Sequence, residues 1–216
     1  MSHSLHRRGT PESLKNDYIL LVTAAKGYND AENAKEKMRQ VLDLMWEIGP
    51  ANTGSNETGT ILSGVSVEEI KEGFTKTPRV RCCFDKKEKM QETLRRLIEM
   101  DLGLSVTISG PREDVEEMCH QFGIQPHSDN FSLDIWGKKE QLPDEEILEF
   151  ITMCGHGMIS RQLVEDTIAK VKKGVLTPEQ GAVRIGSPCV CGLFNPDRAI
   201  KSLQKYVPEK KEGDLE

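Results

Sequence analysis

Three cysteines and a histidine lie in two short segments of the C-terminal third, and these residue types are metal ligands. The first segment, 153–158, reads MCGHGM, and the second, 187–192, reads SPCVCG. Thiolate sulfur and imidazole nitrogen are the groups that bind zinc and iron–sulfur centres in proteins. A helical pattern follows each segment, which predicts a metal centre where the two segments meet. Its candidate ligands are Cys154, Cys189 and Cys191, with His156 beside them.

Glycines flank these candidate ligands, and we predict that Gly155, Gly157 and Gly192 line the centre. A residue without a Cβ lets the backbone approach a bulky inorganic group and turn its N–H groups toward it. The expected helices begin after the two segments. A helix N-terminus lowers the pKa of a nearby thiol, and this would favour the thiolate that a metal requires.

An iron–sulfur cluster is the first interpretation of this pattern. Cys-x-Cys and Cys-x-His are tighter than the usual spacing of a zinc knuckle, which favours a [4Fe–4S] cluster held by three cysteines. Three cysteines leave one iron open, and an open iron can act as a Lewis acid. We therefore expect an iron–sulfur protein of anaerobic metabolism, either a lyase of the dehydratase type or a sulfur-handling enzyme. Its candidate catalytic residues are His156, as an acid or base, and Arg198, as a partner for an anion.

Two other interpretations stay open at this point. The same three cysteines and His156 would supply a Cys₃His zinc site, which makes the chain a zinc-stabilised interaction or regulatory protein without catalysis. In the third interpretation the cysteines are incidental to a metal-free domain that binds a small molecule. The sequence does not decide between an enzyme and an accessory protein.

The remaining cysteines do not resemble the first three. Cys82 and Cys119 fall on apolar stripes, where a buried free cysteine behaves as a small hydrophobe. Cys83 points to the opposite face of its strand. Whether one of these three supplies a fourth ligand is left open.

Composition limits the class of protein. The 216 residues are 37% hydrophobic and 30% charged, which is typical of a folded domain with a core. The formal net charge of -6 argues against a nucleic-acid partner. No run approaches the roughly 18 apolar residues of a membrane span, and the N-terminus lacks the apolar centre of a secretory signal. We therefore expect a cytoplasmic protein whose substrate or partner protein is unidentified, and which is a candidate homo-oligomer.

The elements that must position these residues alternate between strand and helix patterns in the first two thirds of the chain. Strands are expected at 17–25, 79–84, 104–109 and 131–136, and helices at 30–48, 87–100 and 113–122, with a short helix from Ser66. This alternation predicts an α/β or α+β fold with a small open or ferredoxin-like sheet.

The chain is expected to divide near residues 137–143, where the sequence GKKEQLP is charged and turn-forming. This gives a flexible tail at 1–16, an α/β domain at 17–137, a C-terminal all-helical cysteine-containing subdomain at 144–207 and a second flexible tail at 208–216. The polar segment 51–64 is expected to be a mobile surface loop. A phosphate-binding role is disfavoured there because the Gly-Lys-Ser/Thr ending is missing.

Overall fold

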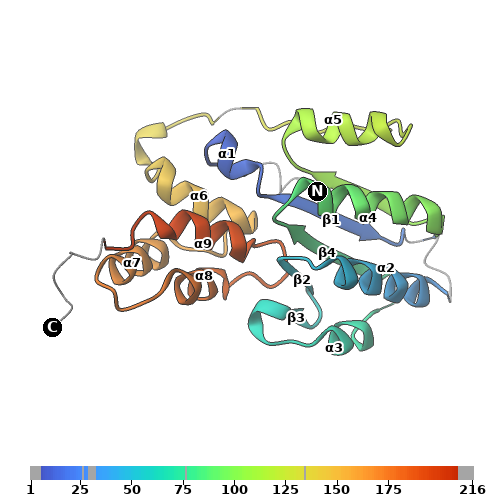
Figure 1. Ribbon diagram of the computed structural model, residues 1–216, viewed down its shortest axis with the longest axis horizontal. Coiled ribbons are helices and arrows are strands. Elements are labelled where there is room, and N and C mark those ends of the chain that lie inside the picture. The colour runs from blue at the N-terminus through green and yellow to red at the C-terminus, as the bar shows by residue number, and fades with distance from the viewer. Residues whose placement is uncertain (1–5, 26, 29–32, 76, 134, 209–216) are drawn as a thin grey trace, which may run out of the picture.

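A five-stranded antiparallel sheet forms the framework of the computed structural model, which describes residues 6–25, 27–28, 33–75, 77–133 and 135–208 (Figure 1). The strand order is β3-β2-β4-β1-β5, and every neighbouring pair is antiparallel. The strands are β1 (Tyr18–Thr23), β2 (Asn52–Ser55), β3 (Gly59–Thr60), β4 (Arg79–Phe84) and β5 (Ser105–Ser109).

Helices account for most of the remaining chain. Four of them belong to the sheet half: α2 (Ala34–Ile48), α3 (Val67–Glu72), α4 (Lys87–Met100) and α5 (Arg112–Gln121). Four more form the helical half: α6 (Glu145–Cys154), α7 (Arg161–Lys172), α8 (Pro178–Gly186) and α9 (Pro196–Gln204). The short helix α1 (Pro11–Leu14) precedes β1, and two 3-10 turns span Ile61–Ser63 and Lys139–Gln141.

The topology confirms the predicted fold class. Helix α2 connects β1 to β2, helix α4 connects β4 to β5, and β1 and β4 lie side by side in the sheet. Without the short β3, this order is that of a ferredoxin-like sandwich, in which two β-α-β units share one antiparallel sheet.

The two faces of the sheet contribute to two different cores. In β4 the side chains of Val80, Cys82 and Phe84 pack with α2 and α4, and Cys82 lies in the core as expected. Cys83 points to the opposite face, where it is buried with residues of α6 to α9. The helical half is therefore packed directly on the sheet. Whether the two halves are separate domains stays a prediction.

The N-terminal residues correct one expectation, because the part of the 1–16 tail that the structure describes is packed. From Arg7 onward it contacts both halves, and it includes α1, which Thr10 caps by accepting a hydrogen bond from the Ser13 N–H. Residues 1–5 of this predicted tail, and residues 209–216 of the other, lie outside the described residues.

Segment 51–64 corrects a second expectation, because it is not a loop throughout. It contains β2 and β3, and Asn52 and Thr53 are fully buried. Most of the polar side-chain groups of these two residues find partners, although the Asn52 Oδ1 atom is buried without one. The Thr53 hydroxyl donates to the Arg81 carbonyl at 2.7 Å, and the Asn52 amide donates to the Phe194 carbonyl at 3.0 Å.

The strand predicted at 131–136 is the third correction. Its described residues, which exclude position 134, form no strand, and Phe131, Leu133 and Trp136 are exposed. Alternation of apolar residues does not make a strand without a neighbouring strand, and β5 ends the sheet on that side. No helix among the described residues combines the length and the apolar character of a membrane span.

Candidate metal centre

The first candidate ligand, Cys154, is the last residue of α6, and this differs from the expected position. Gly155 ends the helix with a φ of +69°, a left-handed conformation that favours glycine. Cys154 therefore lies at the negative end of a helix dipole rather than in front of an N-terminus. A helix C-terminus disfavours a thiolate, so Cys154 lacks the stabilisation that a helix N-terminus would give.

The residues after Cys154 turn sharply toward the second segment. Gly157 also has a φ of +69°, and His156 between the two glycines is exposed. The Nδ1 atom of His156 lies 3.6 Å from the Sγ atom of Cys191. The structure thus brings His156 to the cysteine segment that follows it by more than thirty residues in the sequence.

The second segment is held against the edge of the sheet. Gly192 has a φ of +82°, and a Cβ at this position would lie 2.5 Å from the carbonyl carbon of Thr53 in β2. Only glycine permits this approach, so the function of Gly192 is to seat the loop on β2. Asn195 then caps α9 by accepting a hydrogen bond from the Arg198 N–H at 3.1 Å.

The three candidate thiols are all buried, and two of their separations are short. The Sγ atoms of Cys189 and Cys191 are 3.9 Å apart. Cys154 lies next to Cys189, with which it shares a side-chain hydrogen bond. Cys189 thus contacts both other thiols, and His156 contacts Cys191.

Hydrogen bonds among the three thiols shift the pKa of Cys189 in the opposite direction from those of its two neighbours. Hydrogen bonds from the thiols of Cys154 and Cys191, assisted by backbone N–H groups, lower the pKa of Cys189. The pKa values of Cys154 and Cys191 are raised, chiefly because each donates its hydrogen bond to Cys189. Backbone N–H groups of His156 and Met158 also point at the Cys154 sulfur. Such N–H groups stabilise a thiolate whether or not a metal is bound.

The pairwise distances fit one tetrahedral ion. Zinc bonds of about 2.3 Å to sulfur and 2.0–2.1 Å to nitrogen place two sulfurs about 3.8 Å apart, and a sulfur and a nitrogen about 3.6 Å apart. The observed values are 3.9 Å and 3.6 Å. In the part of the chain that the structure describes, however, no set of three or more His, Cys, Asp or Glu side chains is arranged to hold a metal ion as it stands. The two pairs fit, whereas the complete set of four side chains is not closed around one point.

Cys83 is buried in the same core as the three candidate thiols, and its sulfur hydrogen-bonds a backbone carbonyl. Its Sγ atom donates to the Phe194 carbonyl at 3.4 Å, and burial raises its pKa well above the usual value. Cys82 lies on the opposite face of β4, and Cys119 belongs to α5. The geometry therefore favours the three predicted cysteines over these three.

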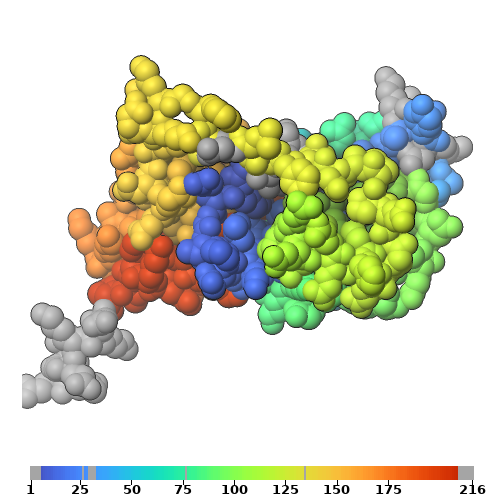
Figure 2. All heavy atoms as spheres, turned by 90° about the horizontal axis from the view of Figure 1, so that it is seen from above, coloured from blue at the N-terminus to red at the C-terminus, as the bar shows by residue number. Residues whose placement is uncertain are grey.

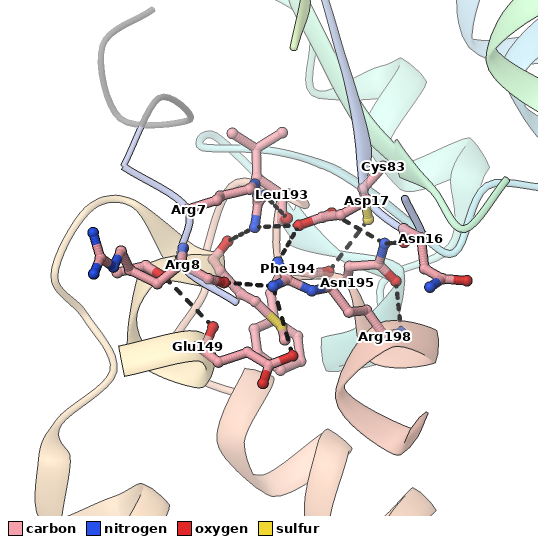
Figure 3. Close-up of polar contacts among 12 residues, drawn as sticks. Arg7, Arg8, Asn16, Asp17, Cys83, Glu149, Leu193, Phe194, Asn195 and Arg198 are labelled. Carbon is pink, nitrogen blue, oxygen red and sulfur yellow. Dashed lines mark hydrogen bonds and ion pairs between the residues drawn. The ribbon is translucent and has the colours of Figure 1, made fainter. Parts of the chain in front are cut away.

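Arg198, a predicted catalytic residue, belongs to a buried polar network instead (Figure 3). Its side chain is 1% exposed, and its Nη1 atom lies 2.7 Å from Oδ2 of Asp17. Its Nε atom donates to the Ser13 hydroxyl at 2.9 Å, and Glu149 lies 3.6 Å from Nη2. The guanidinium pairs with Asp17 rather than with its neighbour Asp197. This placement supports a structural role, and the catalytic role of Arg198 stays a prediction.

Arg7 is a residue of the site region that sequence reasoning missed. It donates from Nη1 to the Met153 carbonyl at 2.9 Å and from Nη2 to the Leu193 carbonyl at 2.6 Å, and it pairs with Asp17 at 3.1 Å. Met153 directly precedes Cys154, and Leu193 follows Cys191 by two residues. Arg7 thus joins the two cysteine segments through their backbones. No local signal in the polar N-terminal sequence marks this contact.

The N-terminal segment occupies the junction between the two halves. Figure 2 shows it, in blue, between the helical half in orange and red and α5 in yellow-green. Arg7 and Asp17 also line a cavity of about 680 Å³ between β5, α5 and residues 124–132. The lining mixes cations, carboxylates and neutral groups, so it favours no class of ligand.

Comparison with protein-family models, with curated proteins and with solved structures found no match to this chain. The chemistry of the centre is therefore inferred from the positions of its side chains.

Proposed function

We propose that the protein binds one metal ion of the zinc type through Cys154, Cys189, Cys191 and His156. The observation that supports this most is the pair of separations, 3.9 Å between two sulfurs and 3.6 Å between sulfur and nitrogen. A cubane cluster favours these distances less, because it places its thiolate sulfurs on different irons and therefore farther apart. The proposed zinc site is the alternative that the sequence left open, whereas the cysteine spacing alone favoured a [4Fe–4S] cluster.

In this proposal the ion joins elements that are distant in the sequence. Cys154 ends α6, whereas Cys189 and Cys191 lie between α8 and α9 on a loop that Gly192 seats against β2. A shared ion would fasten the helical half and the sheet edge together. A small helical unit gains stability from such a link because its own core is limited. The function is then that of a metal-stabilised interaction or regulatory protein.

A [4Fe–4S] cluster held by Cys154, Cys189 and Cys191 is the second candidate. It is supported by the gathering of three buried thiols, since Cys154 shares a hydrogen bond with Cys189, and Cys189 lies beside Cys191. The exposed His156 would then stand beside the open iron as an acid or base, and the protein would be an enzyme of anaerobic metabolism.

Metal content separates these candidates. Protein purified without chelators is expected to contain about one zinc per chain and to be colourless, as a closed Cys₃His centre requires. Replacing a ligand, Cys191→Ser, should release most of that zinc to a competing chelator that leaves the parent protein loaded. The matched control is Cys119→Ser, which removes a thiol from α5 and should leave the zinc content unchanged.

Other results would decide against zinc. Anaerobically purified protein that is brown, with about four irons and four sulfides per chain, would support the cluster instead. Protein without zinc and without iron after both preparations would contradict both candidates. Elemental analysis with sulfide determination provides the measurement.

A further inference from the structure

The cavity of about 680 Å³ lies along the outer edge of the sheet. Its lining includes three successive residues of β5, namely Thr107, Ile108 and Ser109. Successive side chains of a strand point to opposite faces, so a cavity that touches all three runs along the strand edge rather than against one face. Strand β5 pairs with β1 on its inner side, and no strand in the described ranges pairs with its outer side. This side of β5 is therefore an edge to which another strand can add.

Helix α5 and residues 124–132 form the other walls, and together with the strand edge they define what we call the β5 groove. Apolar surface in the groove comes from Ile108, Val115 and Ile124. An extended segment that adds to a sheet edge gains affinity from main-chain hydrogen bonds and specificity from pockets for alternate side chains. Because the charges of the lining are mixed, the backbone edge rather than a charge is the main element of recognition.

The segment 131–136, which we call the arm, has an alternating apolar pattern but forms no strand in its described residues, which exclude position 134. Leu133 and Trp136 are 77% and 82% exposed. The Trp136 indole nitrogen donates to the Leu133 carbonyl at 3.1 Å, so the two residues are neighbours in space. Neighbouring exposed apolar side chains of this size are typical of an interaction site, and tryptophan is prominent among the residues that dominate interface energies.

The arm begins at the rim of its own groove. Phe131 and Ser132 line the groove, whereas Leu133 and Trp136 are not among its lining residues. The Arg112 guanidinium lies 4.9 Å from the centre of the Phe131 ring, which fixes the start of the arm to α5. The chain thus presents an unpaired strand edge beside a strand-patterned segment, and it does not join the two within one copy. Two copies related by a two-fold axis can join them, because each offers the same groove and the same arm.

We propose that the protein is a dimer in which the arm of each copy occupies the β5 groove of the other. The arm adds to the outer edge of β5 as an extended segment, and Leu133 and Trp136 pack against the apolar lining of the groove. A second copy is favoured over an unrelated peptide because a segment with the required pattern already lies on the chain, next to the groove. The inference does not depend on the proposed metal centre.

Two variants and a matched control test this interface. Leu133→Glu combined with Trp136→Glu disables the arm and leaves the groove intact. Thr107→Lys leaves the arm intact but places a charge at the strand edge, which blocks the addition of another strand. The control is Val175→Glu, because Val175 is a 64% exposed apolar residue in the turn between α7 and α8. Sedimentation equilibrium of the full chain in a reducing buffer gives the dissociation constant of the dimer.

We expect the parent protein to sediment as a dimer. The arm variant and the groove variant should each raise the dissociation constant about 30-fold or more, the effect of losing an interface hot spot. Val175→Glu should match the parent protein. An equimolar mixture of the arm variant and the groove variant should form dimers more tightly than either variant alone, because one intact arm then meets one intact groove. This result distinguishes the exchange from an interface in which the two arms pack on each other.

Three results would overturn the inference. The first is a parent protein that stays monomeric up to about 1 mM, a concentration at which even a weak specific interface forms. The second is a dimer that the arm variant leaves as tight as the parent, which would place the interface elsewhere. The third is a mixture of the two variants that associates no better than each variant does alone.

A synthetic peptide of residues 129–137 replaces the groove variant if Thr107→Lys does not fold. An excess of this peptide should dissociate the parent dimer, because it competes with the arm for the groove. The same peptide with Leu133→Glu and Trp136→Glu should leave the dimer intact. A dimer that resists the unmodified peptide would contradict the exchange.

Discussion

Replacing Asp17 by asparagine is expected to lower the free energy of unfolding by about 3–5 kcal/mol, the usual cost of removing one charge from a buried ion-pair network. The Asp17 side chain is 0% exposed, and it pairs with Arg7 at 3.1 Å and with Arg198 at 2.7 Å. With Glu149, these groups form a set of two cations and two anions. The substitution leaves two buried guanidiniums facing one carboxylate.

A second carboxylate provides the matched control for Asp17. Glu145 pairs with Arg8, from the same N-terminal segment, but the two side chains are 64% and 38% exposed. Glu145→Gln should therefore cost about 1 kcal/mol or less, because solvent screens an exposed pair. Urea-induced unfolding of both variants gives the comparison. Equal losses for Asp17→Asn and Glu145→Gln would show that the buried network does not hold the N-terminal segment to the two halves.

Substitution of Gly192 by alanine is the second change with a large expected effect. An L-residue in the left-handed conformation costs about 1–2 kcal/mol. The new Cβ would also lie 2.5 Å from the Thr53 carbonyl carbon. Overpacking of this kind adds about 1–3 kcal/mol. We expect a total loss of about 2–5 kcal/mol, together with weaker metal binding, because the loop that carries Cys191 must move away from β2.

Gly157→Ala isolates the backbone contribution. Gly157 has a φ of +69° but no atom within 4 Å of an added Cβ, so only the conformational cost of about 1–2 kcal/mol applies. Chemical unfolding measures both losses, and zinc competition measures the effect on the site. A Gly192→Ala protein as stable as Gly157→Ala would mean that the cysteine loop is not packed on β2.

Local patterns in the sequence were sufficient to predict several elements. The alternation of Val80, Cys82 and Phe84 identified β4 and the face that it buries. The helix predicted at 87–100 is α4, Lys87–Met100, with the same bounds. These features succeed because each depends on residues only a few positions apart.

The features that were missed depend on distant partners. Strand β2 is polar and glycine-bearing. It forms a strand because its backbone pairs with β4 and because the Asn52 side chain donates a hydrogen bond to the Phe194 carbonyl. Arg7 and Arg198 meet at Asp17 from opposite ends of the chain. In the candidate site, the sequence indicated the cysteines through their glycine-rich surroundings. It did not indicate Arg7, whose hydrogen bonds to the Met153 and Leu193 carbonyls join the two cysteine segments.

The most direct test is the X-ray absorption spectrum of the metal that the purified protein binds. Three sulfurs at about 2.3 Å and one nitrogen at about 2.0–2.1 Å are expected around zinc. A first shell of oxygen and nitrogen alone, or scattering from a second metal atom close by, would contradict a single ion held by Cys154, Cys189, Cys191 and His156.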